Sequence, residues 1–259
     1  MSFIISSKAE ILKTKRTASF WLSILSAALV PGIFFLAFTL NPSDGTIKDF
    51  SASPWRKLFL LGWQFFSAFA LPMYVILITT LIPQVEVKNN TWKQVFASPQ
   101  SFANIYFSKF LAIHIMIILA FILFNVLLLS TGAVSNLITS KFAFLDDPLD
   151  LALVARLSIK IYISVLGISA IQYYLSLRFK NFVAPVGIGL ALLICSLVAL
   201  NFHWQHMYKM PYNYPILTSD LAKKAGRPLI ENHEWNSIGY FVFFTLLGFA
   251  EMKMRKEKG

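Results

Sequence analysis

The chain has 259 residues, of which 57% are hydrophobic and 14% are charged, and its mean hydropathy is +0.64. A soluble domain carries about 25% charged residues, so these values exclude an ordinary water-soluble globular protein. The net charge is +11, and the basic residues flank apolar runs, which indicates contact with a membrane surface and not with nucleic acid. The single cysteine, Cys195, excludes a disulfide bond within the chain.

Residues 1–19 are expected to form an amphipathic helix along the membrane surface. Ser7 followed by Glu10 fits a capping box, in which each side chain satisfies a free amide at the start of a helix. The apolar face would consist of Ile4, Ile5, Ile11 and Leu12. The charged residues of this interfacial helix are Lys8, Glu10, Lys13, Lys15 and Arg16. Such a helix contacts lipid at the inner leaflet. The residues are equally consistent with a basic segment that only anchors the first span on the cytoplasmic side.

Six apolar runs follow, each close to the length needed to cross a bilayer. About 20 helical residues span a hydrocarbon core of roughly 30 Å, and a backbone without water partners must be helical there. The predicted spans are residues 20–40, 58–82, 110–130, 157–177, 183–201 and 235–252. We therefore predict an all-α integral membrane protein in which residues 1–259 form a single transmembrane domain.

The basic residues predict the orientation of these spans. Six crossings place both termini on one side. If that side is the cytoplasm, the inner segments hold more than half of the 23 basic residues but only a third of the 12 acidic ones. Lysine and arginine concentrate on the cytoplasmic side of membrane proteins, so both termini are expected in the cytoplasm.

The inner connection over residues 83–108 has the pattern of a short helix between two turns. Thr91 and Gln94 fit a second capping box, and Trp92, Val95 and Phe96 form a narrow apolar stripe at helical spacing. Pro99 is expected to open the next helix. The stripe either rests on lipid headgroups or fits a groove on a soluble partner.

The polar residues within and between the spans predict no catalytic or metal site. His203 and His206 share the outer connection over residues 202–234 with a third histidine, but no further ligand at a defined spacing accompanies them. Three polar residues lie inside spans and are candidates for a substrate path: His114, Asn125 and Gln172. Hydrogen bonds between helices are the more ordinary role for such side chains.

A family resemblance rests on the order of several segments. Residues 86–93, then Pro99 and Lys109, resemble the connection between spans two and three of type-2 ATP-binding-cassette permeases. Residues 8–16 are similar to the elbow helix of that family, and residues 172–187 are similar to its junction between spans four and five. The small permeases of lantibiotic-immunity and related peptide-export systems are the most similar group.

The resemblance implies a function that is shared with other chains. It implies a coupling helix that meets a separate ATPase, made by Glu86, Thr91, Trp92, Lys93, Val95, Phe96 and Pro99. ATP and Mg²⁺ would be used by that ATPase and no cofactor by this chain, which has no Gly-x-x-x-x-Gly-Lys-Ser/Thr loop. It also implies a dimer with a second permease copy or a paralogue, located in the plasma (inner) membrane of a bacterium.

Export of an amphipathic or lipid-like molecule, such as an antimicrobial peptide, is the function expected from this resemblance. The alternatives are a membrane-embedded enzyme, a secondary transporter and a membrane-bound assembly factor. The six runs contain no Asp or Glu, apart from Glu251 at the edge of the last one. Proton relays and acid–base catalysis need such groups, so the sequence favours a permease subunit that is not itself an enzyme.

Overall fold

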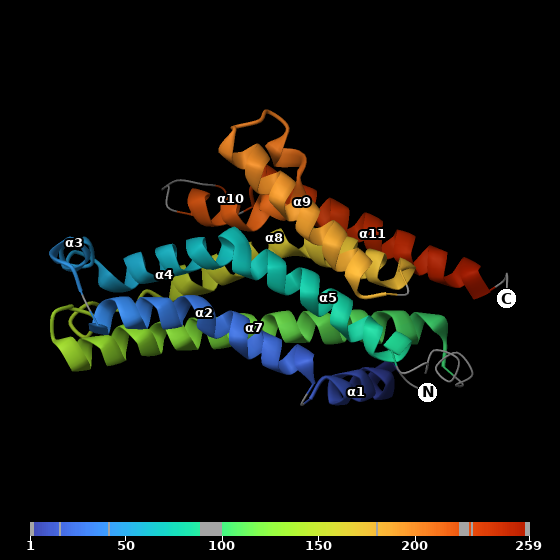
Figure 1. Cartoon of the computed structure of the whole chain (residues 1–259), viewed down its shortest axis with the longest axis horizontal. Coiled ribbons are helices and arrows are strands. Elements are labelled where there is room, and N and C mark those ends of the chain that lie inside the picture. Colours follow the sequence, from blue (N-terminus) through green and yellow to red (C-terminus); the bar gives the residue numbers. More distant parts are fainter. Residues whose placement is uncertain are drawn as a thin grey trace.

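The computed structural model describes residues 3–256 apart from residues 16, 41, 89–99, 180, 223–227 and 229. Within these ranges every regular element is a helix, as predicted (Figure 1). In chain order they are α1 Phe3–Thr14, α2 Ala18–Leu40, α3 Asp44–Asp49, α4 Pro54–Phe65, the π-helix η1 Phe66–Ala70, α5 Leu71–Lys88, α7 Phe102–Thr139, α8 Leu151–Arg178, α9 Val183–Asn201, the 3₁₀ helices η2 Met207–Lys209 and η3 Pro211–Asn213, α10 Tyr214–Leu221 and α11 Asn232–Lys256.

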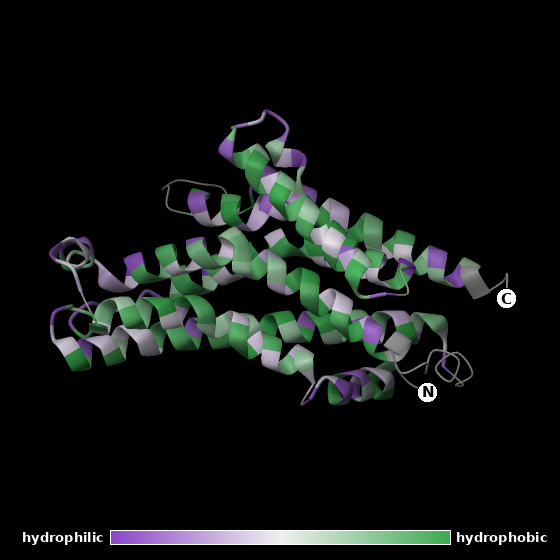
Figure 2. Cartoon of the chain, viewed as in Figure 1, coloured by the Kyte–Doolittle hydropathy of each residue, from purple (hydrophilic) through white to green (hydrophobic). Residues whose placement is uncertain are grey.

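The six predicted spans are confirmed. Among the described residues, six helical segments are long and apolar enough to cross a membrane: Ala18–Leu40, Pro54–Val85, Phe102–Thr139, Leu151–Arg178, Val183–Asn201 and Asn232–Met254. Hydrophobic residues dominate these helices, whereas hydrophilic residues gather at their ends and in the connections (Figure 2). The 38 residues of α7 are about 57 Å long, so this helix is nearly twice as long as the apolar run at residues 110–130 that predicted it.

The helices run roughly lengthwise in one bundle. Helix α2 packs along α7, α5 packs on α8 and α9, and α11 packs along α8. Helix α1 and the C-terminal part of α11 lie at one end of the molecule, and α3 lies at the other (Figure 1). We call these the α1 end and the α3 end. An even number of spans brings both termini to the α1 end.

A wider helical turn lies within the second span. Leu71 donates its amide hydrogen to the carbonyl of Phe66, five residues earlier, which defines η1. Pro72 follows directly, and a proline cannot donate a hydrogen bond and its ring clashes with the carbonyl four residues before it. The extra residue per turn accommodates this proline, while Phe66 stays buried and stacks on Phe124 with ring centres 4.3 Å apart.

An aromatic cluster closes the α3 end. Its members are Phe38, Phe50, Trp55, Phe142 and Phe144, whose rings contact one another across α2, α4 and the connection after α7. The Trp55 indole also donates a hydrogen bond to the carbonyl of Phe144 at 2.6 Å. The connection between α2 and α4 and the connection between α7 and α8 are thus packed together.

The connection predicted over residues 202–234 contains short helices among its described residues. Residues 207–221 fold into η2, η3 and α10, which pack on α8, α9 and α11. Tyr212 and Tyr214 are buried there, and the Tyr212 hydroxyl accepts a hydrogen bond from Gln172 of α8 at 2.7 Å. Burial of this connection between spans depends on tertiary contacts that the sequence pattern did not indicate.

Candidate functional site

Helix α1 is amphipathic, and its polar side faces the protein. Its buried residues are Ser6, Ser7, Glu10 and Thr14. Its exposed large hydrophobic residues are Phe3, Ile4, Ile5 and Leu12. This arrangement is the reverse of a surface helix in a soluble protein, and it suits a helix whose outer side meets lipid.

The capping box predicted at Ser7 and Glu10 is wrong. Helix α1 already begins at Phe3, so Ser7 lies inside it and donates its hydroxyl to the carbonyl of Phe3 at 2.9 Å. The Glu10 carboxylate is therefore not used at a helix start. It forms ion pairs with two lysines instead, one on α1 and one on α7.

The ion pair of Glu10 with Lys109 joins α1 to α7. One carboxylate oxygen of Glu10 lies 2.9 Å from Nζ of Lys109, and the other lies 2.6 Å from Nζ of Lys13. The Lys109 side chain is 1% exposed. Burial alone would raise the pKa of Glu10, but Lys109 and then Lys13 outweigh it and hold this pKa below its ordinary value. Glu10 is thus a buried, charged link.

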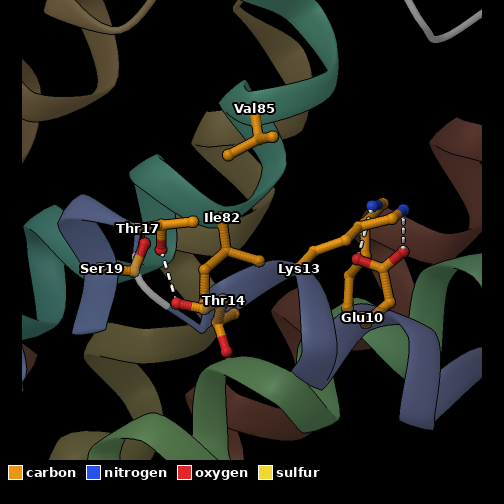
Figure 3. A pocket seen from close by; sticks show the side chains of 8 residues that line it. Glu10, Lys13, Thr14, Thr17, Ser19, Ile82 and Val85 are labelled. Carbon is orange, nitrogen blue, oxygen red and sulfur yellow. Dashed lines mark hydrogen bonds and ion pairs between the residues drawn. The ribbon is translucent and has the colours of Figure 1, made fainter.

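A pocket opens beside this link where α1, α2, α5 and α7 meet. It is small and partly open to the outside. Its lining residues are Glu10, Lys13, Thr14, Thr17, Ser19, Ile82, Val85 and Lys109 (Figure 3). Charged residues of α1 and the apolar residues Ile82 and Val85 of α5 thus line the same pocket (Figure 3).

Both flanks of the predicted coupling segment lie close to α1. Helix α5 ends at Lys88, and Gln100 is the next residue that the structure describes. The side-chain oxygen of Gln100 accepts a hydrogen bond from Ser6 of α1 at 3.1 Å. Helix α7 begins at Phe102, where the Ser101 hydroxyl caps the amide of Asn104. Pro99 therefore does not open this helix, contrary to the sequence prediction.

Most predicted site residues of the coupling segment are outside the description. Thr91, Trp92, Lys93, Val95, Phe96 and Pro99 lie outside the described residues, as does the side chain of Glu86. Of the basic residues predicted for the elbow helix, Lys8 and Lys13 are exposed on α1 and Lys15 is exposed directly after it, whereas Arg16 lies outside the described residues.

The three polar residues of the spans do not form one group. His114 contacts the Tyr162 hydroxyl at 3.0 Å, and Asn125 donates to Ser158 at 3.0 Å, so both join α7 to α8. Gln172 bonds to Tyr212. None of them lines the pocket at α1. Their contacts are those of helix packing, and a substrate path through them stays a prediction.

Another residue at the α1 end was missed by the sequence analysis. Gln84 of α5 is buried and donates hydrogen bonds toward backbone carbonyls at the end of α8 and just after it. The available signal was an amide side chain directly after Pro83, at the end of an apolar run. Its partners lie more than ninety residues away in sequence, so the signal alone did not reveal them.

Comparison with known proteins gives the family. A family model described as ABC-2 family transporter protein matches residues 7–196. The match includes most of α1, the segment between α5 and α7 and most of the first five spans. No curated protein and no solved structure matches the chain. Because the matched region covers more than two thirds of the 259 residues, the chain belongs to the ABC-2 transporter family, as an all-α membrane protein with six spans among its described residues.

Proposed function

We propose that this chain is the permease subunit of an ATP-driven exporter whose ATPase is a separate polypeptide. Membership in the ABC-2 family supports this proposal, because permeases of this family typically pair with an ATPase subunit. The sequence lacks the phosphate-binding loop of such ATPases. ATP and Mg²⁺ are used by the partner, and this chain contributes movement and not catalysis.

One observation carries the coupling part of this proposal: α1 is bonded to the flank that follows residues 89–99 and lines a pocket together with the flank that precedes them. Val85 of α5 lines the pocket together with Glu10 and Lys13 of α1. Ser6 and Glu10 bind Gln100 and Lys109 near the start of α7. A force applied to the segment by the ATPase would reach two spans and α1 together. The Trp92 and Phe96 side chains supply the apolar contact with the ATPase in this proposal.

The substrate is an amphipathic or lipid-like molecule, such as an antimicrobial peptide, that enters from the bilayer. Large hydrophobic side chains cover the outer surfaces of the spans, for example Leu29 on α2, Ile122 on α7 and Phe243 on α11. A molecule held in the membrane reaches such surfaces without crossing water. The exporter is a dimer of this chain with a second copy or a paralogue, in the plasma membrane of a bacterium, and it confers resistance or immunity to the peptide.

Copurification tests the proposed function. The tagged chain is isolated from its native membranes in mild detergent, and vanadate-sensitive ATP hydrolysis and labelling by azido-ATP are measured in the product. We expect both activities with the wild-type chain and at least a tenfold loss for Trp92→Ala with Phe96→Ala. Trp204→Ala is the matched control, since Trp204 is half exposed beyond the far end of α9.

Two results would contradict the proposal. One is the absence of any ATPase from the purified wild-type chain. The other is full retention of the ATPase by the Trp92 and Phe96 double variant.

A further inference from the structure

Gln84 connects α5 to the junction between α8 and α9. Its side chain is 8% exposed. Its amide nitrogen lies 3.0 Å from the carbonyl oxygen of Phe179, 3.2 Å from that of Asn181 and 3.4 Å from that of Ser176. The two amide hydrogens are therefore shared among three acceptors that belong to one short stretch of chain.

These carbonyls need a donor from outside their own helix. The last carbonyls of a helix have no partner within it, and α8 ends at Arg178. The backbone of Phe179 is extended, which turns its carbonyl away from the helical ladder. Asn181 in turn accepts the amide of Ala184 on its side-chain oxygen at 2.9 Å, in the first turn of α9. One side chain of α5 thus holds the end of α8 and, through Asn181, the start of α9.

Gln84 lies near the end of α5 that leads into residues 89–99. Gln84 is one turn before Lys88, where the described part of α5 ends beside residues 89–99. We propose that Gln84 is a positioning residue that transmits movement of the α5 end to the junction of α8 and α9, so that these two spans move with α5. This inference rests on the proposed function, because it assumes that an ATPase moves the α5 end.

The same path extends to the last span. Arg178 at the end of α8 lies 3.0 Å from the Glu251 carboxylate of α11. The Arg178 side chain is half exposed, so the pair contributes little by itself. However, α8 and α11 pack along each other over much of their length, so a displaced α8 carries α11 with it. A separate path leads from the segment through Gln100 and Lys109 to α1.

Two nitroxide labels can follow the two paths separately. They are placed one at a time by Val183→Cys, at the start of α9, and by Leu12→Cys, on α1, in a Cys195→Ser background. Both positions are well exposed, at 76% and 61%. The labelled chain is studied as its complex with the ATPase in lipid nanodiscs, and spectra are compared without nucleotide and with MgATP and vanadate.

Three variants of α5 are compared at each label. Gln84→Met keeps the size of the side chain but has no donor. Gln84→Lys restores donors, and a cation at the end of a helix is favourable. Thr80→Val is the matched control on the same helix, since the Thr80 hydroxyl bonds to the carbonyl of Ile76 within α5.

At residue 183, we expect the nucleotide-dependent spectral change to be lost in Gln84→Met and kept in Gln84→Lys and Thr80→Val. At residue 12, we expect the change to be kept in all three variants. Persistence of the change at residue 183 in Gln84→Met would overturn the inference, as would its loss in Gln84→Lys. Loss at both labels in Gln84→Met would also overturn it, since Gln84 would then support the whole site and not one path. If neither label responds with Gln84 in place, the ATP-driven function itself fails.

Discussion

At the scale of single residues, the buried charge on Glu10 is the feature with the clearest energetic consequence. A buried ion pair adds little compared with a well-packed apolar pair, but removing one partner leaves an uncompensated charge. Glu10 was predicted from the sequence as part of the elbow helix, and Lys109 as the lysine that precedes the third span. Their contact, 99 residues apart in sequence, could not be predicted from either pattern.

Lys109→Met is expected to destabilise the protein by about 3–5 kcal/mol, because it leaves the Glu10 carboxylate buried without its main partner. Thermal unfolding in detergent measures this change. Adding Glu10→Gln should restore a large part of the loss. Lys57→Met is the control, since the pair of Lys57 with Asp49 is much more exposed and should contribute about 0–1 kcal/mol. Equal effects of the two lysine variants would contradict this interpretation.

The lowered pKa of Glu10 predicts the pH dependence of the same contact. A carboxyl group whose pKa is lower in the folded state stabilises the protein at pH values above its unfolded pKa, and this contribution is lost as the pH falls through the folded pKa. The stability advantage of the wild type over Glu10→Gln should therefore be constant above about pH 5 and shrink at lower pH. Unfolding temperatures measured from pH 7 to pH 3 test this. A stability advantage that grows toward acid pH would show that the pKa of Glu10 is raised and not lowered in the folded state.

At the scale of helices, close approach between α8 and α9 depends on a glycine. A Cβ atom at Gly189 would overlap the amide of Gln172 and lie 2.9 Å from Ile76, whereas one at Gly187 would meet nothing within 4 Å. The two glycines lie on different sides of the same helix. Only the contact of Gly189 explains why a residue without a side chain is needed there.

Gly189→Ala is expected to destabilise the protein by about 1–3 kcal/mol, because the added methyl group must displace packed neighbours. Gly187→Ala should instead be neutral or stabilise the protein by up to about 1 kcal/mol, since alanine favours a helix. Unfolding temperatures of the two variants in the same detergent provide the comparison. A similar loss in both would mean that the α9 backbone, and not its contact with Gln172, limits stability.

Helix boundaries show where sequence patterns lose information. The apolar run at residues 110–130 predicted the third span, but α7 extends from Phe102 to Thr139, because its polar ends are as helical as its centre. The capping box at Ser7 failed for a related reason. A helix start depends on which amides lack partners, and α1 begins one turn earlier than the pattern indicated.

At the scale of the whole molecule, the orientation in the membrane is open to a direct test. The proposed function requires the α1 end in the cytoplasm, since the ATPase meets residues 89–99 there. Lys15 lies at the α1 end and Lys141 lies after α7 at the α3 end, and both are exposed. In a Cys195→Ser background, each can be replaced by cysteine in turn.

An impermeant maleimide is expected to label Lys141→Cys in intact cells and to label Lys15→Cys only after the cells are permeabilised. Lysine residues concentrate on the cytoplasmic side of spans, and the inner segments hold most of them here. Labelling is read as a mass shift of the purified chain. The reverse pattern would place the α1 end outside, where no ATP-driven partner could act on it.

The sequence by itself determined that the chain is an all-α membrane protein with six spans. This information is local, because a backbone in hydrocarbon must satisfy its hydrogen bonds within its own segment. Only the tertiary structure decided that Glu10 meets Lys109, that Gln84 holds the junction of α8 and α9, and that Tyr212 is buried against Gln172. Each of these contacts joins segments far apart in the chain. A buried polar side chain needs a partner, and where that partner lies far away in the chain, as in these three contacts, no local pattern specifies it.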